Sequence, residues 1–208
     1  MGSNSSTPHE QALVSEAWDL ADSITVHLDG LMTAIPRDEE GAPHDKYIPL
    51  NQKRVKRIRK ALAQNGLREE LAEVATALPH GTRLLVLNEF WCGDGAQILP
   101  VHEAIVLASK GAVEVRVLMR DDNLGVMDLF LTNGCRSIPK TVLLGEDCVV
   151  MGKWGPRPEE AMDLVKRIKS DPAIAHTYSQ EVHRWYTQDA TQATQAELAV
   201  LLSHAQRP

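Results

Sequence analysis

The chain has 208 residues and a formal net charge of −6, and this acidic balance argues against wholesale attraction to nucleic acid or to anionic membranes. Its hydrophobic content of 43% and charged content of 24% are typical of a globular protein, and no apolar run approaches the roughly 18 residues of a membrane span. Three cysteines are an odd number, which argues against the disulfide framework of a secreted protein. We therefore expect a cytoplasmic protein without a membrane partner.

Helical patterns dominate the first 80 residues. Residues 1–9 are small and polar, and they predict a disordered tail or an expression remnant. Residues 10–80 predict an N-terminal helical extension, because apolar side chains recur at helical spacing from about residue 10 to 31 and again from 51 and from 67 to 78. Asn51 is the expected N-cap of the second of these helices, and Val55 and Ile58 are expected on its inward face.

Strands and helices alternate from residue 82 to about residue 169, within a predicted domain of residues 81–170. The turn Gly145-Glu146-Asp147 favours a hairpin between the last two strands. The order β-α-β-α-β-β-α predicts an α/β fold in which one mixed four-stranded sheet lies between helical layers. Residues 171–208 predict a C-terminal helical extension. The strands are expected at 82–90, 113–119, 141–144 and 148–151, and the helices at 96–110, 123–131 and from Pro156 to about 169.

Cys92 stands where the first of these strands gives way to a helix. Free backbone N–H groups and the positive end of the helix dipole stabilise an anion there, so a thiol at this position should ionise readily. Arg136 would also lower the pKa of Cys92, whereas Asp94 and Glu89 would raise it, and the sequence leaves this balance open. We expect Cys92 to be accessible and at least mildly acidified.

Four motifs carry a resemblance to a known family. Trp91-Cys92-Gly93 is similar to the start of the thioredoxin motif Trp-Cys-Gly-Pro-Cys, and Pro100 lies where the thioredoxin active-site helix carries its kinking proline. Ser137-Ile138-Pro139 resembles the thioredoxin segment with the conserved cis-proline, and Gly155 corresponds to the glycine near the end of the last strand. Over residues 82–169 the chain therefore resembles the thioredoxin superfamily.

A closer resemblance is to uncharacterised bacterial thioredoxin-like proteins with a Trp-Cys-Gly-Asp motif, here Trp91 to Asp94. Two departures from thioredoxin affect the mechanism that the resemblance implies. The position of the second active-site cysteine is Gly95, and the position of the buried acid that serves that second thiol is Val86. We therefore do not expect a dithiol thioredoxin.

These residues predict a single-cysteine thiol–disulfide oxidoreductase. A lone thiolate can attack a disulfide and form a mixed disulfide that an external thiol resolves, or it can be oxidised to a sulfenic acid. A disulfide-bearing protein or a low-molecular-weight thiol is the expected partner, and we expect no cofactor and no metal. Cys92 is the predicted catalytic residue, and the residues expected to shape its site are Trp91, Gly93, Asp94, Gly95, Arg136, Ile138 and Pro139.

Several alternatives stay open. A redox-inactive binding module would use the groove at Pro139 for a peptide or a small thiol, and a monothiol-glutaredoxin-like cluster carrier is disfavoured because its Cys-Gly-Phe-Ser motif is missing. Cys135 is a candidate second thiol, although a packed cysteine is the preferred interpretation. The basic run 53–60 favours a solvated helix face over a phosphate-rich partner. The oligomeric state is open.

Overall fold

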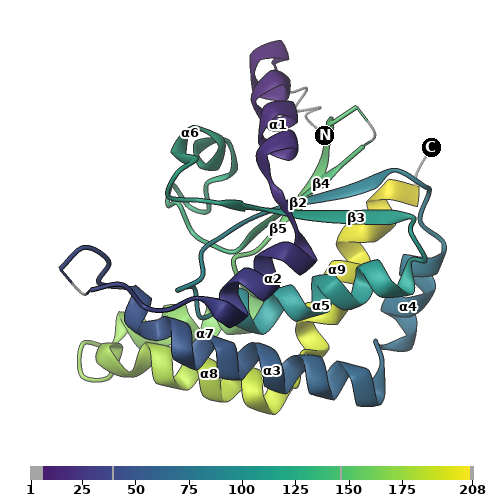
Figure 1. The fold of residues 1–208 in the computed structure, drawn as a ribbon. Coiled ribbons are helices and arrows are strands. Elements are labelled where there is room, and N and C mark those ends of the chain that lie inside the picture. The colour runs from purple at the N-terminus through teal and green to yellow at the C-terminus, as the bar shows by residue number, and fades with distance from the viewer. Residues whose placement is uncertain (1–6, 39, 146, 207–208) are drawn as a thin grey trace.

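The computed structural model describes residues 7–38, 40–145 and 147–206, and within them five strands form one mixed sheet in the order β1-β3-β2-β4-β5 (Figure 1). β2 runs parallel to β3, and the other neighbouring pairs are antiparallel. The predicted α/β fold and its mixed sheet are confirmed, but the predicted number of four strands is wrong. The strands are β1 (Asp22–Ser23), β2 (Thr82–Asn88), β3 (Val113–Met119), β4 (Lys140–Leu144) and β5 (Val150–Trp154).

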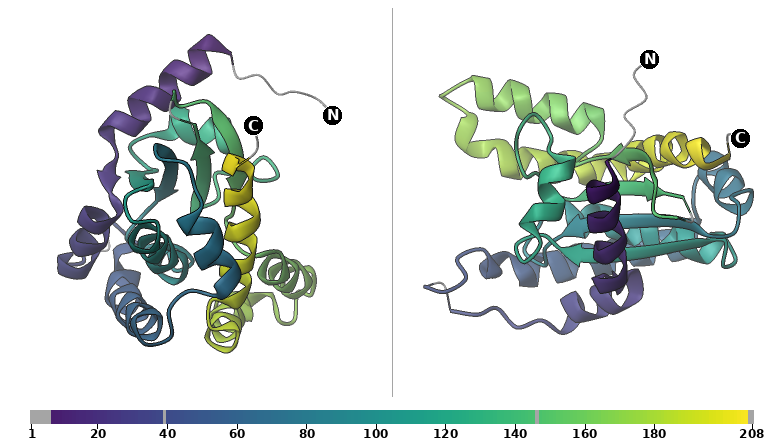
Figure 2. Two further views of the ribbon diagram at one scale, coloured as in Figure 1. Left: turned by 90° about the vertical axis from the view of Figure 1, so that its right-hand side faces the viewer. Right: turned by 90° about the horizontal axis from the view of Figure 1, so that it is seen from above.

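Helices cover both faces of the sheet (Figures 1 and 2). Both termini of the described chain belong to helical segments, since α1 begins at Pro8 and a short 3-10 turn follows α9. The helices are α1 (Pro8–Leu20), α2 (Ile24–Thr33), α3 (Ile48–Asn65), α4 (Glu69–Thr76), α5 (Gly95–Ala108), α6 (Leu124–Met127), α7 (Glu159–Ser170), α8 (Tyr178–Asp189) and α9 (Gln192–Ser203).

β2 is the centre of the core, and its alternate side chains enter two different clusters. Leu84 and Val86 pack with α2, α3, α4, α5 and α9 on one face of the sheet. Leu85 and Leu87 pack on the other face with α1, α6 and the side chain of Cys92. Because both faces are covered, β2 is continuously apolar from Leu84 to Leu87 and does not alternate with polar residues there.

The strand missed by the prediction, β1, lies where one long helix was expected between residues 10 and 31. The helix α1 ends at Leu20, and Asp22 and Ser23 pair with Val117 and Arg116 of β3. The Ser23 side chain then accepts a hydrogen bond from the Val26 N–H and caps α2. The chain changes sides of the sheet here, since the buried residues of α1 and α2 belong to opposite clusters. The helical spacing of apolar residues therefore continues across the break between α1 and α2, and it does not reveal that break.

Three further boundaries differ from the prediction. α1 begins at Pro8, inside the predicted tail, with Thr7 and Glu10 forming a capping box, while residues 1–6 lie outside the described residues. α3 begins at Ile48, so Asn51 is a buried residue of its first turns and not its cap. The predicted helix 123–131 is a short α6 followed by a 3-10 turn, Asp128–Phe130.

The hairpin between β4 and β5 exists, although its second strand starts at Val150 and not at Cys148. Cys148 is buried with a φ of 61° and precedes that strand, and Glu146 of the predicted turn lies outside the described residues. Among the described residues no helix is both long enough and apolar enough to cross a membrane.

Candidate functional site

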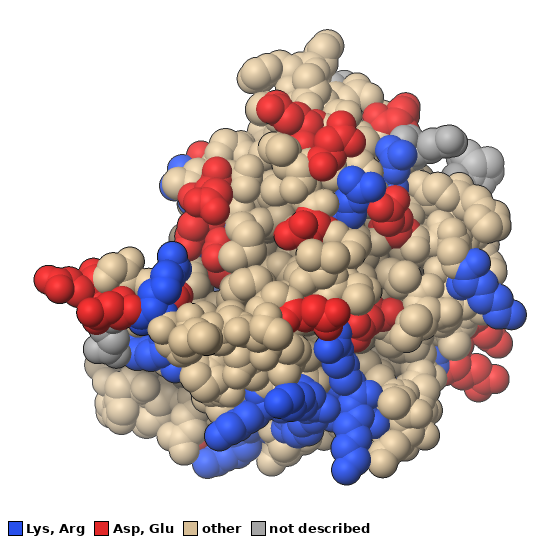
Figure 3. Space-filling model, in the orientation of Figure 1, with Lys and Arg blue, Asp and Glu red and all other residues tan. Residues whose placement is uncertain are grey.

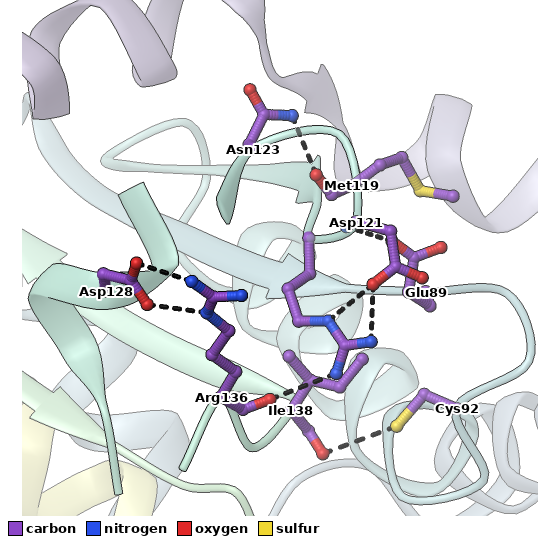
Figure 4. A network of polar contacts seen from close by, with 9 residues as sticks. Glu89, Cys92, Met119, Asp121, Asn123, Asp128, Arg136 and Ile138 are labelled. Carbon is purple, nitrogen blue, oxygen red and sulfur yellow. Dashed lines mark hydrogen bonds and ion pairs between the residues drawn. The ribbon is translucent and has the colours of Figure 1, made fainter. Parts of the chain in front are cut away.

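Cys92 lies in the turn between β2 and α5, and two backbone groups meet its sulfur, of which Figure 4 shows the Ile138 carbonyl. The Gly95 N–H donates to Sγ at 3.3 Å, and the thiol faces the carbonyl oxygen of Ile138 at 3.5 Å. The peptide bond between Ile138 and Pro139 is cis. The fold thus brings together a cysteine from one end of β2 and a proline loop 46 residues later in the chain.

The thiol of Cys92 is buried and hard to ionise. Its residue is only 5% exposed, and burial, followed by the charge of Asp94, raises the thiol pKa to about 12. Hydrogen bonds from the Gly95 and Asp94 backbone and the charge of Arg157 act in the opposite direction but are outweighed. The expectation of an accessible, mildly acidified Cys92 is therefore wrong: the N-terminus of α5 does favour the anion, but desolvation costs more.

Asp94 forms the charged pair closest to the thiol. Its Oδ2 lies 2.6 Å from Nη2 of Arg157, a residue of the turn between β5 and α7. Burial raises the pKa of Asp94, and the charge of Arg157 lowers it. Gly155 makes this turn with a φ of +103°, and a Cβ on it would lie 2.5 Å from the carbonyl oxygen of Pro139. Because Gly155 has no side chain, the turn that carries Arg157 can contact the proline loop directly.

Arg136 does not act on the thiol in the way that we expected. Its guanidinium pairs with Asp128 through two contacts of 2.6 and 2.7 Å (Figure 4), and its charge is not among the causes that shift the pKa of Cys92. Glu89 likewise accepts a hydrogen bond from the Asp121 N–H at 2.8 Å instead of facing the sulfur. The charges of Asp94 and Arg157 are among the main causes that shift the pKa of the thiol, and Arg54 also interacts with it.

The other predicted residues have distinct positions. Trp91 is partly buried, with the ring of His44 4.8 Å away and the guanidinium of Arg120 5.0 Å from its own ring. Gly95 is the first residue of α5. Cys135 is an exposed free cysteine, so the preferred interpretation as a packed residue is wrong.

The helical extensions cover the site, and the sequence did not predict which of their residues do so. A Cβ on Gly93 would lie 2.8 Å from the imidazole of His183 and 3.0 Å from Nη1 of Arg54, so α8 and α3 both approach the turn here. Asn51 of α3 donates to the carbonyl oxygen of Phe90 at 2.9 Å and accepts from Arg54 at 2.7 Å. The basic run 53–60 includes Arg54, but the pattern of charges does not show which of its residues is partly buried at the site and which are solvated.

A cavity of about 660 Å³ opens beside the thiol. Its walls come from the turn of Cys92, the proline loop, the Pro156–Arg157 turn, and the first turns of α3 and α8 with the residues that precede them. Arg120 after β3 and Lys169 at the end of α7 complete the lining. The volume of the cavity is that of a small-molecule site. The lining residues from the two extensions include His44, Tyr47, Leu50, Arg54, Tyr178, Ser179, Val182 and His183.

A mixed sheet with a cysteine at a strand-to-helix turn, facing a cis-proline, is the arrangement of a thioredoxin-fold protein. A family model described as thioredoxin matches residues 41–170, which is well over half of the 208 residues. The chain therefore belongs to the thioredoxin family. The match begins at residue 41 and so includes α3 and α4 of the N-terminal extension as well as the predicted domain of residues 81–170.

Two solved structures share the fold. A protein of unknown function from Pseudomonas aeruginosa has a TM-score of 0.66 and 18% identity, with 92% of this chain and 97% of that chain covered. An HIV epitope scaffold has a TM-score of 0.61 and 18% identity, with 91% of this chain and 96% of that chain covered. At this identity the similarity concerns the fold alone. A search of curated proteins returned no match.

Proposed function

We propose that this protein binds a low-molecular-weight ligand in the cavity beside Cys92 and Pro139, and that its thiol stays protonated in the free protein. The observation that carries the proposal is a cavity of about 660 Å³ that is lined in part by Cys92, a residue whose thiol pKa burial raises to about 12. Compared with an ordinary thiol, such a pKa leaves about a thousandfold less thiolate at neutral pH. The thiol then serves as part of the wall of the cavity and not as a ready nucleophile.

The Trp-Cys-Gly-Asp motif belongs to this proposal, because its aspartate, Asp94, is the second cause of the raised thiol pKa. A cytoplasmic setting also belongs to it, since a free exposed Cys135 is compatible with a compartment that keeps thiols reduced. A bound peptide is less well supported than a small molecule, because α3 and α8 narrow the space over Gly93.

A second candidate is the single-cysteine oxidoreductase, which the position of Sγ between the Gly95 N–H and the Ile138 carbonyl supports. In that reaction the Cys92 thiolate attacks one sulfur of a disulfide, a mixed disulfide forms, and the other sulfur leaves as a thiolate. An external thiolate then attacks the substrate sulfur of the mixed disulfide. Cys92 leaves as a thiolate, and the external sulfur and the substrate sulfur form a new disulfide. This route needs the thiol to ionise after a substrate has bound.

Glutathione and its mixed disulfides are suitable probes for both candidates. Calorimetry with reduced glutathione measures binding to the wild type and to Cys92→Ser, and a reduction assay with a glutathione mixed disulfide measures turnover. The binding module predicts binding by both proteins and turnover by neither. Turnover by the wild type that Cys92→Ser abolishes would select the oxidoreductase, and the absence of both binding and turnover would contradict the proposed function.

A further inference from the structure

The cavity beside Cys92 is strongly cationic in a chain whose net charge is −6. Its lining includes Asp94 as the one carboxylate among the described residues. Two of the lining arginines pair with aspartates outside the lining, and a third pairs with Asp94, so the cavity retains an excess of positive charge. The cationic lining residues are Arg54, Arg120, Arg136, Arg157 and Lys169.

Arg54 is the lining cation that most needs a partner. It is partly buried, and burial lowers its pKa. Its Nη1 donates to the side chain of Asn51 at 2.7 Å, but no carboxylate of the described residues lies within ion-pair distance of it. A guanidinium presents five N–H donors in a planar fork that suits carboxylate and phosphate groups. Arg54 therefore has donors to spare at the rim of the turn that holds Cys92.

A buried donor beside the thiol also lacks a partner. Within the described part of the chain, Nε of Arg157 is buried and completes no hydrogen bond, whereas the Asp94 carboxylate and the Tyr186 hydroxyl interact with each other. Asp94 is only 8% exposed and lines the cavity together with Arg157, while the phenol of Tyr186 lies close to Asp94. Unpaired buried polar groups are costly, so a ligand that supplies acceptor oxygens to the donors gains affinity here.

Apolar and aromatic side chains complete the cavity. Trp91, Tyr47 and Tyr178 line it together with Leu50 and Val182, which provides surface for carbon atoms as well as for a charged group. A small organic anion matches this combination better than a bare inorganic ion does.

We infer that the cavity takes a small organic anion whose carboxylate or phosphate group is held by Arg54 and Arg157. This inference rests on the proposed binding function and names the chemical class of its ligand. An anion at this position would repel a thiolate, so the ligand class agrees with a thiol that remains protonated. Arg54 and Arg157 come from elements more than one hundred residues apart, and the anion would join α3 to the turn that precedes α7.

Amide chemical shifts of the full-length ¹⁵N-labelled protein test the inference, with succinate, inorganic phosphate and uncharged succinamide as probes. The expected result is a saturable shift of the Gly93 and Asp94 amides with succinate or phosphate and none with succinamide. The arm that responds shows whether a carboxylate or a phosphate is preferred. No shift with either anion would overturn the inference.

Arg54→Gln and Lys56→Gln each remove one positive charge from α3, and Arg54→Lys keeps the charge at position 54. Arg54→Gln should weaken anion binding by about tenfold or more, and the Arg54→Lys protein should bind more tightly than the Arg54→Gln protein. Lys56→Gln, an exposed position on the same helix, should leave binding unchanged. Equal losses in the Arg54→Gln and Lys56→Gln proteins would mean unspecific charge screening and would contradict the site. Equal binding of succinate and succinamide would contradict the inference that the ligand is an anion, but it would agree with the proposed binding function.

Discussion

Substitution of Gly95 by alanine should destabilise the protein. Gly95 is the residue found where dithiol thioredoxins have their second cysteine, and a Cβ at this position would overlap the Oδ1 atom of Asn88 and lie 2.7 Å from its Cγ. Asn88 is 1% exposed, and its Nδ2 donates to the Glu89 carbonyl at 3.0 Å and lies 3.3 Å from Nε2 of His27. The amide is therefore buried and held through its nitrogen, so moving its oxygen away from a new Cβ disturbs these contacts.

The magnitude follows from two costs. Forcing one extra carbon into a packed site costs about 1–3 kcal/mol. Displacing the Asn88 amide removes a buried hydrogen bond, which adds about 1 kcal/mol. The higher helix propensity of alanine returns up to about 1 kcal/mol. We expect Gly95→Ala to lower the free energy of unfolding by about 1–3 kcal/mol, and Gly95→Cys to lower it at least as much, because its side chain is larger.

Urea unfolding measures this effect, and Gly125→Ala is the matched control because a Cβ on Gly125 meets nothing within 4 Å. If Asn88 is the obstacle, Asn88→Ala should make the Gly95→Ala substitution less costly in the double variant than in the wild-type background. A Gly95→Ala protein as stable as the wild type, or a double variant with additive losses, would show that Asn88 does not obstruct a side chain at position 95.

Three further substitutions test neighbouring parts of the account. Asp94→Asn removes the charge that is the second cause of the raised thiol pKa, so the pH dependence of Cys92 alkylation should move to lower pH, and an unchanged profile would contradict this cause. Burial lowers the pKa of His102 in the folded protein to about 4, whereas in the unfolded chain the imidazole has its ordinary pKa of about 6.5. Between these two pH values the unfolded chain binds one more proton than the folded protein, so the free energy of unfolding falls as the pH drops from about 6.5 toward 4. His102→Gln should reduce the loss in unfolding free energy between pH 7 and 5 by about 2 kcal/mol, and the same loss in both proteins would contradict the linkage. Asn51→Ala leaves the Phe90 carbonyl without its donor and should cost about 1–3 kcal/mol in urea unfolding, whereas a change below about 0.5 kcal/mol would contradict it.

Much of the fold could be predicted because it depends on local patterns. The alternation of strands and helices indicated a mixed sheet between helical layers, and both faces of β2 are covered in the structure. β1 escaped prediction because two residues carry no period of their own. Asp22 and Ser23 form a strand only through pairing with β3, almost one hundred residues later in the chain.

The charge state of the thiol could not be predicted for a similar reason. The turn and the helix N-terminus that favour a thiolate are local and visible in the sequence. The burial that outweighs them depends on segments distant in the sequence, since the side chain of Cys92 packs in a cluster with α1, α6 and Ile138. Arg54 and His183 are close to this turn only in the folded protein, and no spacing within either helix indicates it.

We propose that Cys92 is a protonated thiol in the wall of a ligand cavity. Its protonation state can be measured from the pH dependence of iodoacetamide alkylation of the native protein, followed separately for each cysteine peptide by mass spectrometry. The exposed Cys135 is the internal reference, and denatured protein shows that both peptides can be detected. We predict rapid modification of Cys135 at neutral pH and no modification of Cys92 until the pH rises above about 10, as its pKa of about 12 requires. Alkylation of Cys92 at pH 7 as fast as that of Cys135 would contradict the account.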